Sequence, residues 1–249
     1  MKVKTILISQ PEPPKVENTP YADLEKKQKV KVDFVPFIHV EGVDANHIRR
    51  QKIDLADYSA IIMTSRNSVD HFFRLAEEMR YEVPTSLKYF CLSEAVAYYL
   101  QKYVVYRKRK IYVGKRTIKD LAPTLKKFKK EKFLLPSSNM LKPAIPNQLN
   151  DLNLDWKQGV FYKTVVSDLS HLEHVFYDIV VFFSPSGIKS LFENFPDFEQ
   201  NNTRIAVFGN STNRAAEKHG LKVNIKAPTK EAPSMTMAIE NYIKEQNKK

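Results

Sequence analysis

The sequence predicts an α/β protein with two similar parallel-sheet domains. First, its 249 residues suffice for one large domain or two small ones. Second, apolar runs of strand length alternate with helical patterns along nearly the whole chain, which is typical of parallel α/β sheets. Third, a strand–turn–helix segment at 58–73 recurs in similar form at 177–192. Together these observations favour duplication of one α/β unit over a single large sheet.

The individual elements follow from local patterns. Short runs rich in β-branched and aromatic residues predict strands, and apolar residues recurring every three or four positions predict helices. The expected strands are 3–9, 30–40, 60–64, 89–92, 133–135, 159–166, 179–183, 205–208 and 223–225. The expected helices are 67–80, 94–102, 117–130, 186–194, 211–219 and 234–246.

The repeat places equivalent residues in equivalent positions. In each copy a buried strand ends in a serine, Ser65 or Ser184, and turns into a helix. A looser match between 90–96 and 207–212 follows in the same order. Two extended, alternating segments, 30–41 and 157–166, lie between the units and are able to pair as a two-stranded connection, although the sequence alone does not require it.

Composition excludes several classes of protein. The single cysteine, Cys91, rules out a disulfide framework and cannot by itself form a thiolate metal site. The six glycines build neither a dinucleotide-binding fingerprint nor a P-loop. The N-terminal segment resembles a first strand more than a signal peptide, and no apolar run approaches the roughly 20 residues that span a bilayer. We therefore expect a soluble, cytoplasmic protein without a membrane partner.

The net charge of +12 is concentrated in one stretch. Residues 102–132 hold 13 Lys and Arg against two carboxylates, so the rest of the chain is close to neutral. Apolar spacing across 117–130 predicts an amphipathic helix with its lysines in water, and a solvated face is the favoured interpretation. Tyr103, Tyr106 and Tyr112 lie among the cations, so a nucleic-acid surface stays open as an alternative.

The usual catalytic motifs are missing, and hydroxyl groups at strand-to-helix turns take their place. The spacing of His171 and His174 favours a surface pair over zinc ligands, so we expect no metal. Each hydroxyl on its own is best explained as a helix N-cap. As a set beside a cleft, they would also bind carboxylates or phosphates, because helix N-termini present free amides there. The residues in question are Thr64, Ser65, Ser68, Ser137, Ser138, Ser184, Ser186, Ser211 and Thr212.

Several of these stretches also carry a family resemblance. The segments are 62–69 (IMTSRNSV), 160–164 (VFYKT), 182–188 (FFSPSGI) and 204–212 (RIAVFGNST). Each is short, but their order and spacing over nearly the whole chain resemble the uroporphyrinogen-III synthase family.

The resemblance implies an architecture. One discontinuous α/β domain would comprise 1–35 and 168–249, and a second would comprise 42–160. Residues 36–41 and 161–167 would form a two-stranded antiparallel linker, with a cleft between the domains.

It also implies a reaction in tetrapyrrole and heme biosynthesis. The linear substrate, hydroxymethylbilane, loses water and closes through a spiro intermediate to uroporphyrinogen III, in which ring D is inverted. The resemblance implies no metal and no organic cofactor, and we expect a monomer. Because the substrate is itself reactive, the enzyme would act mainly by holding it in position.

The resemblance assigns site residues by matching position. Tyr162 is the candidate catalytic residue, which would orient or protonate the departing hydroxyl. The candidate substrate-binding residues are Ser65, Arg66, Asn67, Ser184, Ser186, Arg204, Ser211 and Thr212. Gln10, Ser93 and Val96 depart from the family pattern. Two other functions therefore stay open: a non-catalytic binder of an anionic ligand such as a tetrapyrrole, and a nucleic-acid-binding protein that uses residues 102–132.

Overall fold

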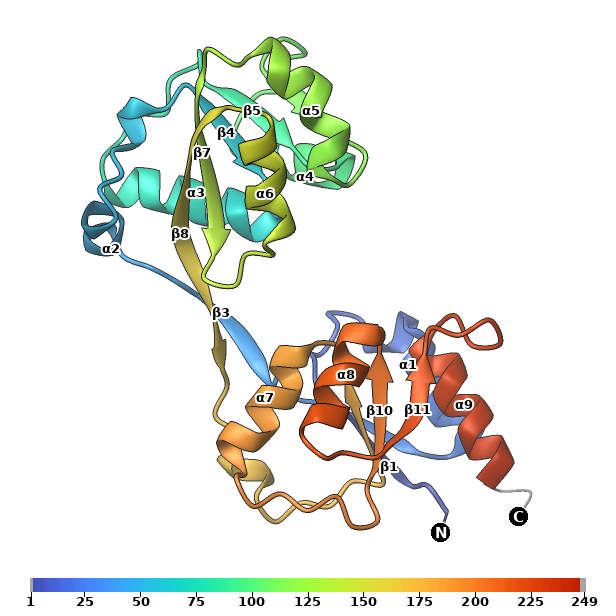
Figure 1. Ribbon diagram of the computed structural model, residues 1–249. Helices are drawn as coiled ribbons and strands as arrows, with labels where there is room; N and C mark the ends of the chain where they lie inside the picture. Colours follow the sequence, from blue (N-terminus) through green and yellow to red (C-terminus); the bar gives the residue numbers. More distant parts are fainter. Residues whose placement is uncertain (1, 247–249) are drawn as a thin grey trace. The chain divides into compact units, whose positions relative to one another are not determined.

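A computed structural model describes residues 2–246 of the chain (Figure 1). By their contacts the residues divide into two compact units: unit 1, Met1–His39 with Val165–Lys249, and unit 2, Val40–Thr164. Among the described residues, no helix has the length and apolar character to cross a membrane.

Unit 1 is built on a five-stranded sheet in the order β11-β10-β9-β1-β2. The strands are β1 (Thr5–Ile8), β2 (Lys31–Phe34), β9 (Ile179–Phe182), β10 (Arg204–Phe208) and β11 (Val223–Ala227), and every neighbouring pair is parallel. The helices are α1 (Pro20–Gln28), α7 (Pro185–Asn194), α8 (Asn210–Lys218) and α9 (Met235–Gln246).

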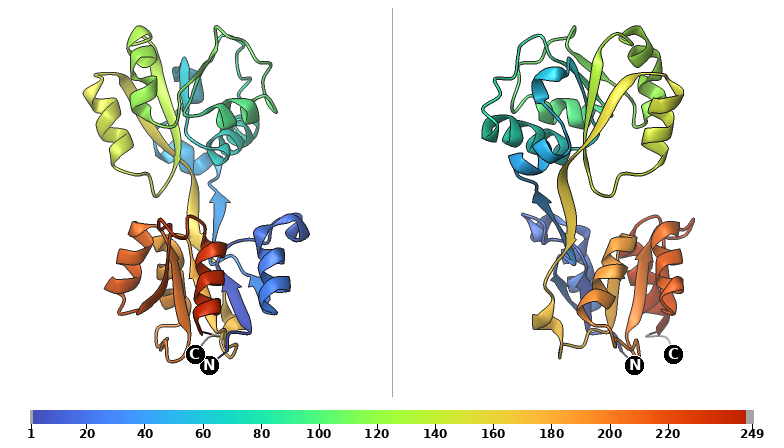
Figure 2. Two further views of the ribbon diagram at one scale, coloured as in Figure 1. Left: turned by 90° about the vertical axis from the view of Figure 1, so that its right-hand side faces the viewer. Right: turned by 60° about the vertical axis from the view of Figure 1, so that its left-hand side comes forward.

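Both faces of this sheet are covered. Because side chains alternate along a strand, Ile6 and Ile8 of β1 pack with the α1 and α9 side, whereas Leu7 packs with the α7 and α8 side. Figure 1 and Figure 2 show the two helix pairs on opposite faces. A sheet buried on both faces explains why its strands are continuous apolar runs.

Unit 2 has a six-stranded sheet in the order β3-β8-β7-β4-β5-β6. The strands are β3 (Ile38–Gly42), β4 (Ala60–Met63), β5 (Lys88–Cys91), β6 (Ile111–Val113), β7 (Lys132–Ser138) and β8 (Asp155–Val166), and the pairs from β8 to β6 are parallel. The helices are α2 (Ala45–Arg50), α3 (Arg66–Glu78), α4 (Glu94–Leu100), α5 (Ile118–Lys127) and α6 (Ala144–Asp151).

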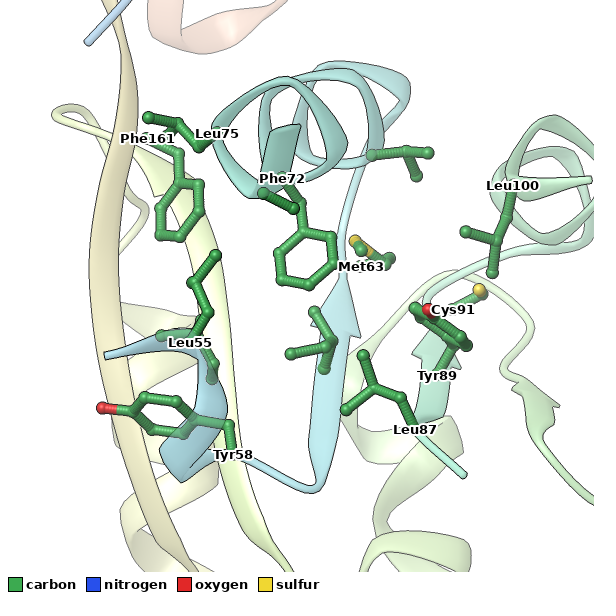
Figure 3. Close-up of a cluster of buried hydrophobic side chains, with 14 of the residues drawn as sticks. Leu55, Tyr58, Met63, Phe72, Leu75, Leu87, Tyr89, Cys91, Leu100 and Phe161 are labelled. Atoms are coloured by element: carbon green, nitrogen blue, oxygen red, sulfur yellow. The ribbon is translucent and has the colours of Figure 1, made fainter. Parts of the chain in front are cut away.

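The two faces of this sheet again hold separate cores. Figure 3 shows Phe72 of α3 packed toward Met63 of β4, with Phe161 of β8 nearby. The opposite core gathers Ile62 and Phe90 beneath α5 and α6. The core therefore fixes the direction of α3, whose N-terminus lies at the carboxyl edge of the sheet.

The predicted α/β class with parallel sheets is confirmed, but one expected strand is wrong. Residues 30–40 do not form a single strand: β2 ends at Phe34, β3 begins at Ile38, and they belong to different sheets. Pro36 lies between them and has no N–H to donate to a sheet. β3 lies beside β8 in the sheet order, while an antiparallel linker stays a prediction.

Within residues 2–246, three α-helices and one strand were not expected from the sequence: α1, α2, α6 and β6. β6 has only three residues and α2 only six, so neither offers even two full periods of its pattern. α6 contains Pro146, a residue that weakens the helical prediction. α1 buries only Ala22 and Leu24, so its apolar face is narrow.

Candidate functional site

The carboxyl edge of the unit 2 sheet carries the central pair of side chains. Ser65 follows β4 directly and caps α3, accepting a hydrogen bond from the amide of Ser68 at 3.1 Å. The hydroxyl of Ser68 returns the interaction, accepting from the amide of Ser65 at 3.0 Å. This reciprocal capping fixes the Ser65 side chain where the strand ends.

Tyr162 of β8 meets Ser65 at this edge. The residue is 7% exposed, and its hydroxyl lies 3.3 Å from the Ser65 hydroxyl. Burial raises the pKa of Tyr162 above 10, and the hydrogen bond with Ser65 offsets part of that rise. The phenol therefore keeps its proton at neutral pH and is available as a hydrogen-bond donor.

The sequence did not single out a third member of this group, His71. Its ring stacks on that of Tyr162, with 5.0 Å between the centroids and 20° between the planes. Burial and the charge of Arg74 lower the pKa of His71, against the opposing influence of Asp70, so the imidazole is neutral at pH 7. His71 lies on α3, which Ser65 caps, and no local sequence signal indicated its contact with Tyr162.

A pocket of about 460 Å³ opens beside this group. Its polar lining comes from several strand ends: Thr64, Ser65, Arg116, Thr117, Ser137, Ser138, Lys142 and Tyr162. Thr117 caps α5 as Ser65 caps α3, accepting from the amide of Asp120 at 3.3 Å. Two helix N-termini and two cations thus face one cavity, which suits a ligand with carboxylate groups. Arg116, Thr117 and Lys142 were not among the predicted site residues, because the sequence showed Arg116 only as part of the basic stretch and Thr117 only as the start of an expected helix.

Arg66 and Asn67 occupy the first turn of α3 and are exposed. The guanidinium carbon of Arg66 lies 5.3 Å from the centre of the Tyr99 ring, which restrains the side chain. Both residues therefore lie beside the Ser65 cap.

Unit 1 repeats the capped strand end. Ser184 follows β9 and accepts from the amide of Gly187 at 3.2 Å, with Ser186 half-buried in the first turn of α7. Ser211 lies exposed in the first turn of α8, after Gly209, whose φ of +85° favours glycine. These three serines gather at the carboxyl edge of the unit 1 sheet.

Thr212 and Arg204 do not join that group. Thr212 is 1% exposed, so its side chain faces the protein interior rather than a ligand. Arg204 begins β10 and so lies at the amino edge, where its guanidinium is 3.7 Å from the Asp178 carboxylate. Asp178 also accepts from the amides of Lys4 and Thr5. A strand's two ends lie at opposite edges of a sheet, which separates Arg204 from Ser184 and Ser211.

No group of three or more His, Cys, Asp or Glu side chains positioned for a metal ion occurs in residues 2–246. Cys91 is buried, and burial raises the pKa of its thiol to about 12, so it is no metal-binding thiolate at neutral pH.

Fold and site together define a class: a protein of two parallel α/β units whose capped helix N-termini present hydroxyls and amides at the carboxyl edges of the sheets. Residues 20–237 match the family model described as uroporphyrinogen-III synthase HemD. The chain belongs to the uroporphyrinogen-III synthase family, a family of cyclising lyases in tetrapyrrole biosynthesis.

Individual relatives agree with that assignment. The uroporphyrinogen-III synthase of Chlorobaculum parvum is 24% identical, over 97% of this chain and all of the relative. Among solved structures, uroporphyrinogen-III synthetase from Helicobacter pylori matches with a TM-score of 0.62 and 18% identity, over 97% of this chain and 99% of that one. A mutant uroporphyrinogen III synthase from Thermus thermophilus matches with a TM-score of 0.54 and 13% identity, over 99% and 100% of the two chains. These structural matches establish the shared fold.

Proposed function

We propose that this chain converts linear hydroxymethylbilane to uroporphyrinogen III, with loss of water and inversion of ring D. The observation that carries the proposal is the pair formed by Tyr162 and Ser65, whose hydroxyls lie 3.3 Å apart beside the pocket at the carboxyl edge of unit 2. The substrate has carboxylate side chains on every ring, which suit the helix N-termini and cations that line this pocket.

Tyr162 acts on the departing hydroxyl of the substrate. It donates a hydrogen bond to that oxygen as the carbon–oxygen bond breaks, and the hydroxyl takes up a proton from solvent and leaves as water. The pyrrole nitrogen electrons stabilise the cation left behind, and ring closure later returns a proton to solvent when the attacked pyrrole regains its aromaticity. Because its pKa is raised, Tyr162 is a weak acid, and its main contribution is a hydrogen bond that strengthens in the transition state. Ser65 orients the phenol, and His71 limits the rotation of its ring.

Binding and positioning of the substrate supply the rest of the catalytic effect. Amides at the starts of α3 and α5, with Arg66, Asn67, Arg116 and Lys142, hold carboxylates in unit 2. Ser184, Ser186 and Ser211 do so in unit 1. Holding a flexible substrate by several of its carboxylates favours the spiro route over simple closure, because the reacting ends are kept in one orientation. We assign no binding role to Arg204 or Thr212.

We also propose the domain limits 1–35 with 168–249, and 42–160, with 36–41 and 161–167 as linker strands. The division of contacts after His39 and before Val165 supports these limits. A monomeric state and a cytoplasmic location belong to the same proposal, and gel filtration and cell fractionation test them.

The experiment is a product analysis. The purified chain is given freshly prepared hydroxymethylbilane, and the oxidised products are separated by chromatography into type III and type I isomers. The proposal expects predominantly type III, whereas type I alone, as in the reaction without enzyme, would refute it. A chain that binds the tetrapyrrole tightly but yields only type I is a non-catalytic binder.

A further inference from the structure

Unit 2 carries a second charged feature, at the edge of its sheet opposite the proposed active site. Arg107–Lys110 leads directly into β6, and Lys126–Lys130 leads into β7. Both segments therefore lie at the amino ends of parallel strands, whereas Ser65 and the proposed substrate pocket lie at the carboxyl ends. The cations of these segments cannot be the groups that hold substrate in that pocket.

An aromatic contact joins the two basic segments. Tyr112 of β6 donates a hydrogen bond to the carbonyl oxygen of Arg109 at 2.8 Å. Its ring lies 4.7 Å from that of Phe128, centre to centre. We call the surface so assembled the basic edge; it comprises Arg107, Lys108, Arg109, Lys110, Lys126, Lys127, Lys129 and Lys130.

Most of the charge of the basic edge is not neutralised by ion pairs within the protein. Seven of these residues are exposed and form no ion pair within residues 2–246, and Lys110 donates to the carbonyl oxygen of Ser86. Two nearby carboxylates are already engaged, because Glu131 pairs with Lys88 at 2.8 Å and Asp57 lies 3.6 Å from Lys132. A lysine-rich helix face that only contacts water does not require positive charges to gather apart from the carboxylates in this way.

A pocket of about 340 Å³ opens at the same edge of the sheet. Phe73, Tyr89, Tyr103 and Val105 supply apolar and aromatic walls, and Arg107 and Lys110 from the basic edge also line it. Phe73 and Tyr103 are stacked with their centres 4.5 Å apart, so their orientation is fixed. An aromatic pocket beside cations matches a ligand in which flat rings alternate with phosphates.

We propose that the basic edge of unit 2 binds single-stranded nucleic acid, with phosphates on Arg107–Lys110 and Lys126–Lys130 and one base in the pocket beside Tyr103. A strand is favoured over a free nucleotide because eight cations on two segments exceed what the phosphates of one nucleotide neutralise. It is favoured over an anionic membrane because Phe73, Tyr89 and Tyr103 line a concave pocket, and the exposed Val105 and Tyr106 beside it are two loop side chains and not the apolar face of an amphipathic helix.

The test measures fluorescence anisotropy of a labelled 12-nucleotide single-stranded RNA with the full chain at several salt concentrations. For single strands the slope of log K against log salt is roughly −0.7 per neutralised phosphate, so engagement of four phosphates gives about −3. Between 50 and 200 mM salt the affinity should then fall by about 50-fold. No binding at 50 mM salt, or binding that is insensitive to salt, would overturn the proposal.

Matched variants locate the surface. Lys126→Glu with Lys127→Glu reverses two charges in the last turn of α5, and Lys26→Glu with Lys27→Glu does the same in the last turn of α1. The first pair should weaken binding at least tenfold and reduce the slope by about 1.4, while the second leaves both nearly unchanged. Equal losses of RNA affinity in the two double variants would refute a defined binding site and would indicate an effect of net charge alone.

A second comparison addresses the pocket. Val105 is 79% exposed and lines it, so Val105→Glu should weaken binding roughly tenfold without loss of folding. Val175→Glu, at a half-exposed valine of unit 1, is the control and should have no effect. Unlabelled RNA and AMP are each added as competitors of the labelled RNA. If AMP competed as effectively as the RNA, the ligand would be a free nucleotide, and the proposal of a bound strand would be overturned. Flotation with phosphatidylglycerol vesicles, without RNA binding, would instead identify a membrane surface.

Discussion

Arg204→Met separates a structural from a substrate-binding role for this residue. The guanidinium and the Asp178 carboxylate lie 3.7 Å apart, and both side chains are largely buried, at 12% and 6% exposure. At an effective dielectric constant of about 20, charges at that distance attract by about 4.5 kcal/mol. After Arg204 is removed, Asp178 still accepts from Lys4 and Thr5, and methionine fills much of the volume. We therefore expect the free energy of unfolding to fall by about 2–3 kcal/mol.

Urea denaturation at pH 7 measures this loss, and steady-state kinetics with hydroxymethylbilane measures KM. The structural account expects a lower urea midpoint with KM within about twofold of the wild type, because Arg204 lies at the amino edge of its sheet. An unfolding free energy unchanged within about 0.5 kcal/mol, together with a KM raised tenfold, would refute it and return Arg204 to the substrate site.

Four further substitutions test the cores and the site. Tyr162→Phe should lower kcat by about 10- to 100-fold with little change in KM or in urea midpoint, because only a hydrogen bond of a weak acid is lost; full activity would remove Tyr162 from the mechanism. Because burial lowers the pKa of His71 below 6.5, the unfolded chain takes up the proton first. Wild-type stability should therefore decline as the pH falls through 6.5 and level off below the folded-state pKa, and His71→Phe should remove that part of the pH dependence, as measured by denaturation between pH 5 and 8. Phe72→Ala removes a fully buried ring of the unit 2 core and should lower the free energy of unfolding by about 3–5 kcal/mol; a loss under about 1 kcal/mol would contradict the packing. Tyr89→Phe should raise it by about 1 kcal/mol, because the Tyr89 hydroxyl is buried and has no hydrogen-bond partner among residues 2–246, and a clear loss of stability would reveal one.

The strong apolar patterns made most of the fold predictable. Strand 60–64 and helix 67–80 are both long enough to show their period, and both contribute to the unit 2 core. The expected strand at 30–40 is wrong because residues of high β propensity lie on both sides of Pro36 and hid the break at this proline, while the hydrogen bonds that end β2 depend on partners elsewhere in the chain. The short α2 and β6 depend on tertiary packing and have no pattern of their own.

The candidate site was predictable only in part, for a related reason. Ser65 and Ser184 were identifiable because a capping serine after a buried strand is a local signal. Arg204 directly precedes the expected strand at 205–208, so the sequence already indicated the amino edge of the sheet; its site role came from the family resemblance and not from its place in the sheet. The stacking of His71 on Tyr162 joins residues 91 positions apart, and no local pattern reports such a contact.

The central claim is that the chain directs ring closure of hydroxymethylbilane through ring D inversion. The most direct test is the ratio of type III to type I uroporphyrinogen formed by the wild-type chain, by Tyr162→Phe and by buffer alone from one substrate preparation. We expect type III to predominate with the wild type and the type I share to rise in Tyr162→Phe, because slower turnover lets spontaneous closure compete. Wild-type product with the isomer ratio of buffer alone would contradict the claim.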